Sequence, residues 1–126
     1  MTNAVMIQFL KRGERYGEYL SARRCFLERE AGEGGMSGRG DQSGQAVEKG
    51  CLHAELEDLR TAEYDFRIVM GALYRLEPED RELIIAYYAK HMTAYAIAAD
   101  LDISESTFWR RKRKAMQFLK QVLNIA

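Results

Sequence analysis

The chain has 126 residues, a length that suits one ordinary domain or a small domain with an appended helical arm. It is 47% hydrophobic with a formal net charge of zero, and this composition excludes wholesale disorder. Two isolated cysteines and the absence of any long apolar run argue against a disulfide framework, a zinc ribbon and a membrane span. A single proline, few β-branched residues and abundant Ala, Leu, Glu, Arg and Lys predict an all-α fold.

Residues 1–30 are predicted to form an N-terminal helical arm. Apolar side chains such as Phe9 and Tyr16 recur in steps of four and seven, which keeps them near one helical face. Two glycines each weaken the middle of this helix by about 1 kcal/mol relative to alanine. A break or kink is therefore expected at Gly13 or Gly17.

Residues 31–50 are predicted to be a Gly-rich flexible loop. Six of the residues between 32 and 44 are glycine, and the segment holds almost nothing to bury. A phosphate-binding P-loop would need Gly-Lys-Ser or Gly-Lys-Thr at the start of a helix, and the segment lacks that ending. The composition favours a linker over a nucleotide site.

Residues 51–76 are predicted to form a long linking or dimerisation helix. Its apolar residues follow one another mostly in steps of three and four, with Ala62 between the third and fourth, as a helical hairpin or coiled-coil seam requires. They are Leu52, Leu56, Leu59, Phe66, Met70 and Leu73. Two interpretations stay open: the stripe packs against the first helix of the same chain, or it contributes to a homodimer.

Residues 77–126 are predicted to form a helix-turn-helix domain. Pro78 and the acidic pair that follows it are typical of the first turn of a helix, which is expected to end near Lys90. Thr93 is predicted to cap a short helix over 94–101. Ser104 is predicted to cap a last helix that runs to about Leu123.

The segment from Thr93 onward meets the demands of a helix-turn-helix. Ala98 is small where the second helix should cross the first. Asp102 occupies the turn position that usually holds glycine, and aspartate tolerates the left-handed conformation. Ile103 then fills the core and Phe108 anchors the second helix. The second helix is the expected recognition helix.

Basic residues concentrate on this recognition helix. Five of the six basic residues after residue 90 form the run 110–114, whereas residues 51–90 hold nine acidic and five basic residues. Arg110 and Arg113 are the best candidates for bidentate contacts to guanine. Lys112, Lys114, Tyr95 and Thr93 are placed for the phosphate backbone. The complete predicted DNA-binding set is Thr93, Tyr95, Ser104, Glu105, Ser106, Thr107, Trp109, Arg110, Lys112, Arg113 and Lys114.

Other chemistry finds little support in the sequence. Trp109 suits a core or partner interface as well as a DNA contact, and both interpretations stay open. His53 and His91 have no partners at metal-ligand spacing. We find no nucleophile, base or carboxylate pair with an orienting partner, so we expect no metal, no cofactor and no enzymatic activity.

Two stretches resemble region 4 of the sigma-70 family, which grips the −35 promoter element and docks on the RNA polymerase flap. They are residues 76–84 (LEPEDRELI) and 96–107 (AIAADLDISEST). The resemblance covers roughly the last 48 residues and assigns base contacts to Glu105, Ser106, Trp109 and Arg110. Arg111 stands where that family usually has an apolar residue.

The layout as a whole is similar to phage-encoded regulators of the ArpU and RinA kind. These combine a helical N-terminal part, a Gly-rich loop, a long helix and a terminal helix-turn-helix. Residues 35–41 (GMSGRGD) stand in the loop position, with Ser37 where the family often has proline. The resemblance implies a phage or prophage regulator of late genes.

We therefore expect a sequence-specific, double-stranded-DNA-binding transcriptional activator, acting as a homodimer. RNA polymerase is a candidate second partner. The apolar first ten residues precede a basic stretch, the reverse of a secretory signal, so a cytoplasmic location in a bacterial host is expected. Two alternatives stay open: a ring-forming DNA-packaging subunit like a small terminase, and a sigma-like module that acts through polymerase contacts.

Overall fold

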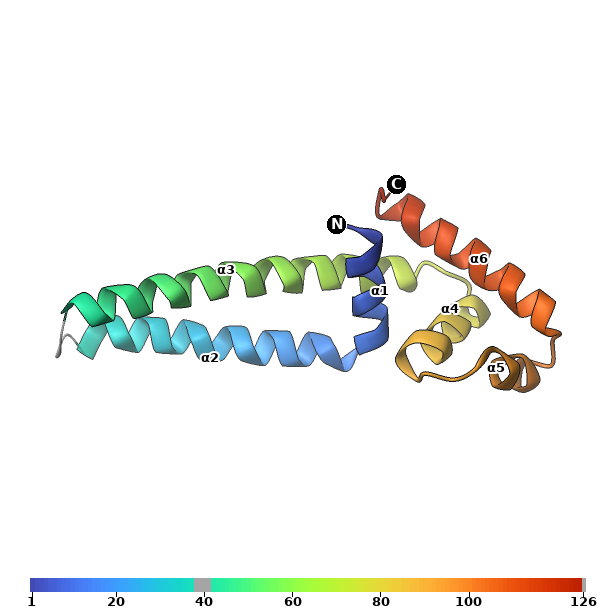
Figure 1. Cartoon of the computed structure of the whole chain (residues 1–126), viewed down its shortest axis with the longest axis horizontal. Coiled ribbons are helices and arrows are strands. Elements are labelled where there is room, and N and C mark those ends of the chain that lie inside the picture. Colours follow the sequence, from blue (N-terminus) through green and yellow to red (C-terminus); the bar gives the residue numbers. More distant parts are fainter. Residues whose placement is uncertain (38–41, 126) are drawn as a thin grey trace. The chain divides into compact units, whose positions relative to one another are not determined.

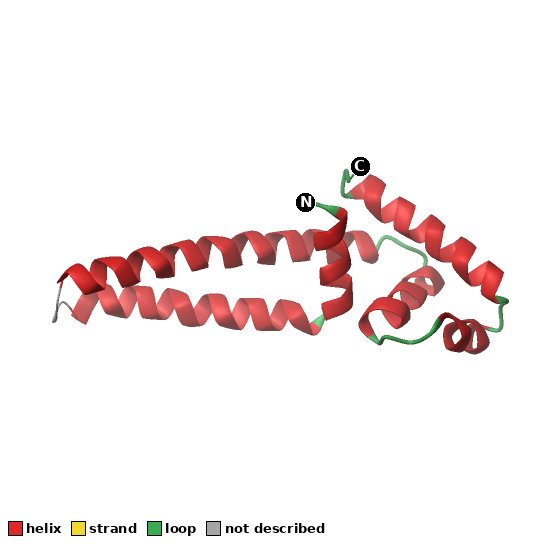
Figure 2. Cartoon of the chain, in the orientation of Figure 1, coloured by secondary structure: helices red, strands yellow, loops and turns green. Residues whose placement is uncertain are grey.

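A computed structural model describes the backbone of residues 1–37 and 42–125 and the side chains of residues 1–31 and 52–125. The described residues form helices joined by short turns, with no strand among them, which confirms the all-α prediction (Figures 1 and 2). The chain divides into two compact units. One comprises Met1–Tyr16 with Phe66–Ala126, and the other comprises Gly17–Asp65.

Two long helices, α2 (Arg15–Ser37) and α3 (Gln42–Leu73), run side by side in Figure 1. The end of α3 belongs to the first unit, and the stretches of both helices within residues 17–65 form the second unit, an antiparallel hairpin. Leu20 and Leu27 of α2 and Leu56 of α3 are 2–4% exposed and form its apolar seam. The stripe predicted on the long helix therefore packs within the same chain over this stretch. Burial of each such leucine contributes about 1.5–3 kcal/mol to folding.

The bounds predicted for the loop, residues 31 and 50, were both wrong. Helix α2 continues to Ser37, and α3 begins at Gln42. Extending an existing helix adds one hydrogen bond per residue, so a glycine lowers helix stability without forcing the helix to end. After Gln42 the sequence is rich in helix-forming residues. Residues 38–41, within the GMSGRGD stretch, lie outside the described residues.

The first unit begins with α1 (Asn3–Arg12), which ends at Gly13. Gly13 has φ +79°, a conformation that favours glycine, and this confirms the predicted break at one of its two possible positions. Gly17, the other position, lies inside α2. The turn at Gly13 changes the chain direction.

Helix α1 packs against residues 85–89 and against Phe66 of α3, all within the first unit, so the prediction of one arm over residues 1–30 was wrong. The ring of Phe9 meets Phe66 edge-on, with ring centroids 5.7 Å apart. Met6 and Leu10 are also buried. These three side chains gain more by joining the core of this unit than by lying along an exposed arm.

The C-terminal helices are α4 (Pro78–Ile84), α5 (Ala94–Leu101) and α6 (Glu105–Val122), with a π-helical turn, η1 (Ile85–Ala89), after α4. Pro78 opens α4 as predicted. The core that holds these helices together consists of fully buried apolar side chains. They include Val69, Leu73, Leu83, Ile84, Ile97, Phe108 and Leu119.

The π-helical turn η1 was not predicted. The Lys90 backbone N–H donates to the Ile85 carbonyl five residues earlier, at 3.0 Å. This wider turn places the adjacent rings of Tyr87 and Tyr88 edge to face, with centroids 4.9 Å apart. Both rings belong to the aromatic surroundings of α6.

Candidate nucleic-acid interface

Two hydroxyl caps position the helices of the helix-turn-helix, as the sequence predicts. The Thr93 side chain accepts a hydrogen bond from the Ala96 N–H at 3.1 Å and opens α5. The Ser104 side chain accepts from the Thr107 N–H at 3.2 Å and opens α6. Each cap satisfies a backbone donor that a helix N-terminus leaves unpaired, and this fixes where each helix begins.

The turn between α5 and α6 is a Schellman motif centred on Asp102. Asp102 has φ 57° and ψ 47°, the left-handed conformation predicted for it. The Ile103 N–H donates to the Ala98 carbonyl at 2.9 Å, and the Asp102 N–H donates to the Ala99 carbonyl at 3.2 Å. This turn sets the direction in which α6 leaves α5.

Helix α6 has a buried face and an exposed polar face. Phe108, Ala115 and Leu119 are 0–3% exposed and hold the helix against the unit's core. Because 3.6 residues make one turn, Ser106, Arg110, Arg113, Lys114 and Gln117 share the opposite side, and all five are exposed. We call these five residues the outer face of α6. It contains four of the predicted DNA-binding residues; Gln117 was missed, although the same periodicity places it there.

The other predicted contacts surround the N-terminal ends of α5 and α6. Tyr95 is 74% exposed, and Thr93, Ser104 and Glu105 are also exposed. The Ser104 and Thr107 hydroxyls lie 2.9 Å apart and hydrogen-bond to each other. Thr107 is half-buried, and the hydrogen bond between these two hydroxyls belongs to the N-cap of α6. Glu105 lies in the first turn of α6, where a negative charge complements the helix dipole.

Lys112 lies on a flank of α6 and not on its outer face. Its ammonium nitrogen is 4.7 Å from the ring centroid of Tyr87, 5.3 Å from that of Tyr88 and 5.4 Å from that of Trp109. A cation over aromatic faces is stabilised by the ring quadrupoles. Burial raises the pKa of the Tyr88 hydroxyl, which stays neutral in this cluster.

Trp109 is part of the same aromatic cluster and is 43% exposed. Its ring centroid lies 5.0 Å from that of Phe108 and 6.0 Å from that of Tyr87, both in edge-to-face geometry. One side of the indole therefore packs within the unit and another reaches solvent. Packing and a DNA contact are both compatible with this position.

Arg111, the residue in the normally apolar position, is accommodated by an ion pair. Its guanidinium lies 3.4 Å from the Glu79 carboxylate at the start of α4. Both side chains are substantially exposed, so the charge of Arg111 stays solvated and adds no buried charge to the middle of α6.

The described part of the chain contains no group of three or more His, Cys, Asp or Glu side chains that could hold a metal ion. None of its helices is both long and apolar enough to cross a membrane.

The comparison with known families agrees with this geometry. Residues 66–119 match the family described as Sigma-70, region 4. The match begins inside α3, earlier than the stretches that carry the resemblance in the sequence, and it ends at the last buried residue of α6. No curated protein and no solved structure gives a significant match. The C-terminal part of the chain is thus a sigma-region-4-like helix-turn-helix, a class of DNA-binding module.

Proposed function

We propose that this protein is a sequence-specific transcriptional regulator that reads double-stranded DNA in the major groove with α6. The observation that carries the proposal is the outer face of α6. Arg110 and Arg113 are exposed there, one turn apart, and neither forms an ion pair with a described residue. Free guanidinium groups on a capped helix can make the bidentate contacts that identify guanine.

In vitro selection of duplex DNA by the full chain tests this proposal. A random duplex library should be enriched in a defined motif, and fluorescence anisotropy should then show at least about a thousandfold preference for that motif over unrelated DNA. Enrichment that does not exceed the input library would contradict sequence-specific binding.

We further propose that the protein acts as an activator of phage or prophage late genes, in the manner of the ArpU and RinA regulators it resembles. The order of helices and the region-4-like C-terminal unit support this. A reporter gene behind the selected motif should be transcribed more strongly when the protein is present. Repression of that reporter would contradict the activator role.

A homodimer is the proposed assembly. Large apolar side chains are exposed on the hairpin, including Tyr19, Phe26 and Tyr64 at 50–64%. Light scattering after size exclusion should give about twice the 14.5 kDa mass of one chain. A large closed ring would instead support the terminase-like alternative.

The sigma-like alternative is supported by the match to region 4 itself. In that case the protein would bind RNA polymerase and would not need the outer face of α6. Binding to purified polymerase without any enrichment in the DNA selection would favour this function over the one proposed.

A further inference from the structure

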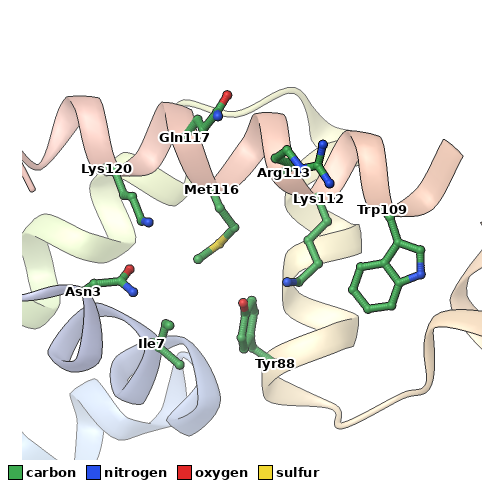
Figure 3. A pocket seen from close by; sticks show the side chains of 9 residues that line it. All are labelled: Asn3, Ile7, Tyr88, Trp109, Lys112, Arg113, Met116, Gln117 and Lys120. Atoms are coloured by element: carbon green, nitrogen blue, oxygen red, sulfur yellow. The ribbon is translucent and has the colours of Figure 1, made fainter. Parts of the chain in front are cut away.

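A cavity of about 450 Å³ lies between α1 and α6, with Tyr88 of η1 on its wall (Figure 3). Ile7 and Asn3 reach it from α1, and Met116 and Lys120 reach it from α6. The volume falls in the range that accommodates a small ligand or part of a larger one. All of these residues belong to the first unit.

Three cationic side chains line this cavity: Lys112, Arg113 and Lys120. No acidic side chain lines it, and none of the three forms an ion pair within the described part of the chain. Three positive charges along one wall without a carboxylate raise the local potential and favour an anion.

Asn3 supplies a polar group that also lacks a partner. Its side-chain oxygen is buried, and it has no hydrogen-bond partner among the described residues. A buried acceptor without a donor costs about 1–3 kcal/mol, and a turn of the Asn3 side chain toward the cavity would relieve this cost. The rings of Tyr88 and Trp109 line the same cavity at an angle to each other (Figure 3).

We propose that this cavity binds a phosphate group. Lys112 and Lys120 would donate charge-assisted hydrogen bonds to its oxygens, and Arg113 would add positive charge at the rim. A turn of the Asn3 side chain would let its amide N–H donate to the same phosphate. The partly exposed indole of Trp109 offers one ring on which a base attached to that phosphate could stack. Asn3 and Lys120, which line this site, were not among the DNA-binding residues predicted from the sequence.

The phosphate can come from two sources, the backbone of bound DNA or a free phosphorylated molecule. Arg113 and Gln117 line the cavity and also belong to the outer face of α6. A DNA strand that crosses this flank could therefore present a phosphate to the cavity while α6 occupies the groove. A free nucleotide would fill the cavity without DNA.

The first experiment tests free phosphate with the full chain. Trp109 is the single tryptophan, so its fluorescence reports on the cavity directly. Inorganic phosphate and adenosine monophosphate are titrated at constant ionic strength, with chloride as the balancing anion. A free-phosphate site predicts saturable changes that weaken by about tenfold or more in Asn3→Asp and Lys120→Gln. Lys90→Gln, an exposed residue outside this cavity, should behave like the wild type.

Asn3→Asp is informative because it should not unfold α1. The first turn of α1 contains no acidic residue, and an added aspartate there complements the helix dipole. Circular dichroism should show unchanged helicity. A weaker phosphate response with intact helicity then reflects charge in the cavity and not a loss of fold.

The second experiment measures the salt dependence of DNA affinity by anisotropy. If a backbone phosphate fills the cavity, Lys120→Gln should lower the slope of log affinity against log salt by about one, while Lys90→Gln leaves it unchanged. A changed slope without a saturable phosphate response identifies DNA as the source. A saturable response with an unchanged slope identifies a free ligand.

The proposal is overturned if the variants match the wild type in both measurements. Failure of the proposed function looks different. If the wild type binds no DNA, the salt experiment has no signal, and the phosphate titration by itself decides whether the cavity is a phosphate site.

Discussion

Arg24 of α2 donates a hydrogen bond from its Nε to the Oε2 of Glu63 on α3, over 2.6 Å. Arg24 also contacts Glu28 one turn later, and Arg60 of α3 reaches the same Glu28 carboxylate at 3.1 Å. Four charges of alternating sign thus link the two helices of the hairpin. Hydrogen bonds from Arg60 and Arg24 hold the pKa of Glu28 below its ordinary value, although burial acts in the opposite direction.

The lowered pKa of Glu28 predicts acid sensitivity of the hairpin. A carboxylate whose pKa is lower in the folded state than in the unfolded state stabilises the fold. Its contribution is complete at pH values above the unfolded-state pKa, and it is lost as the pH falls through the folded-state pKa. Urea unfolding of the full chain should therefore show stability decreasing below the ordinary glutamate range. Glu28→Gln should be less stable at neutral pH and lose less on acidification. Parallel pH profiles for the two proteins would contradict the assignment.

Two glycines should respond to alanine with opposite signs. Gly13→Ala forces a side chain into a left-handed conformation, with the new Cβ 3.4 Å from the Ala89 Cβ, and should lower the free energy of unfolding by about 1–2 kcal/mol. Gly71 lies within α3, and a Cβ added there would meet no neighbouring atom within 4 Å outside its own stretch of helix. Gly71→Ala should raise the free energy of unfolding by about 0.5–1 kcal/mol. Equal effects would show that the turn at Gly13 does not constrain the fold.

The left-handed turn should be sensitive to β-branched residues. Asp102→Val places a branched side chain at φ 57° and should cost about 1–2 kcal/mol of stability. Asp100→Val, two residues earlier in α5, should stay within about 0.5 kcal/mol because both residues have similar helix propensity. Chemical denaturation of the two variants provides the measurement. A smaller loss at Asp102 than at Asp100 would argue against this turn geometry.

The outer face of α6 should separate base reading from backbone contact. Arg110→Ala should cost about 1–3 kcal/mol on the selected motif and relax specificity at one base pair. Lys114→Ala should weaken all sequences alike and reduce the salt slope by about one. Anisotropy on matched and mismatched duplexes distinguishes the two effects. Unchanged motif binding by Arg110→Ala would mean that another face of α6 enters the groove.

Arg111 should be replaceable by an apolar residue. Its ion pair with Glu79 is exposed, and such pairs contribute about 0–1 kcal/mol. Arg111→Leu is therefore expected to change stability by less than about 0.5 kcal/mol while lowering the positive charge of α6. A loss of several kcal/mol in thermal unfolding would show that the pair with Glu79 is needed for packing.

The sequence predicted those parts of the interface that local rules control. Thr93 and Ser104 could be identified as caps because capping depends on a hydroxyl a few residues before its backbone partner. Asp102 could be placed in the turn because it occupies the position that usually holds glycine, and aspartate tolerates the left-handed conformation. Ser106, Arg110 and Arg113 of the outer face followed from helical periodicity once Phe108 was assigned to the core, whereas Gln117 was missed.

Features that depend on distant segments could not be predicted in this way. Lys112 was assigned to the phosphate backbone, but two of the rings around its ammonium group belong to η1, a π-helical turn that was not predicted. Asn3 lines the same cavity as side chains of α6 that lie more than a hundred residues later in the sequence. The packing of Phe9 on Phe66 likewise depends on the tertiary structure, because the two residues lie far apart in the sequence.

The rings of Tyr16 and Phe66 lie 5.9 Å apart, centroid to centroid, where the chain leaves the first unit and where it returns. In topological terms the hairpin is an insertion between two neighbouring positions of a continuous scaffold. A connection of a few residues is long enough to join them, since neighbouring Cα atoms are about 3.8 Å apart. The length of the hairpin can therefore vary without moving the ends of the scaffold that it interrupts. The same two positions are natural splice points for a shortened DNA-binding unit or for a different inserted module.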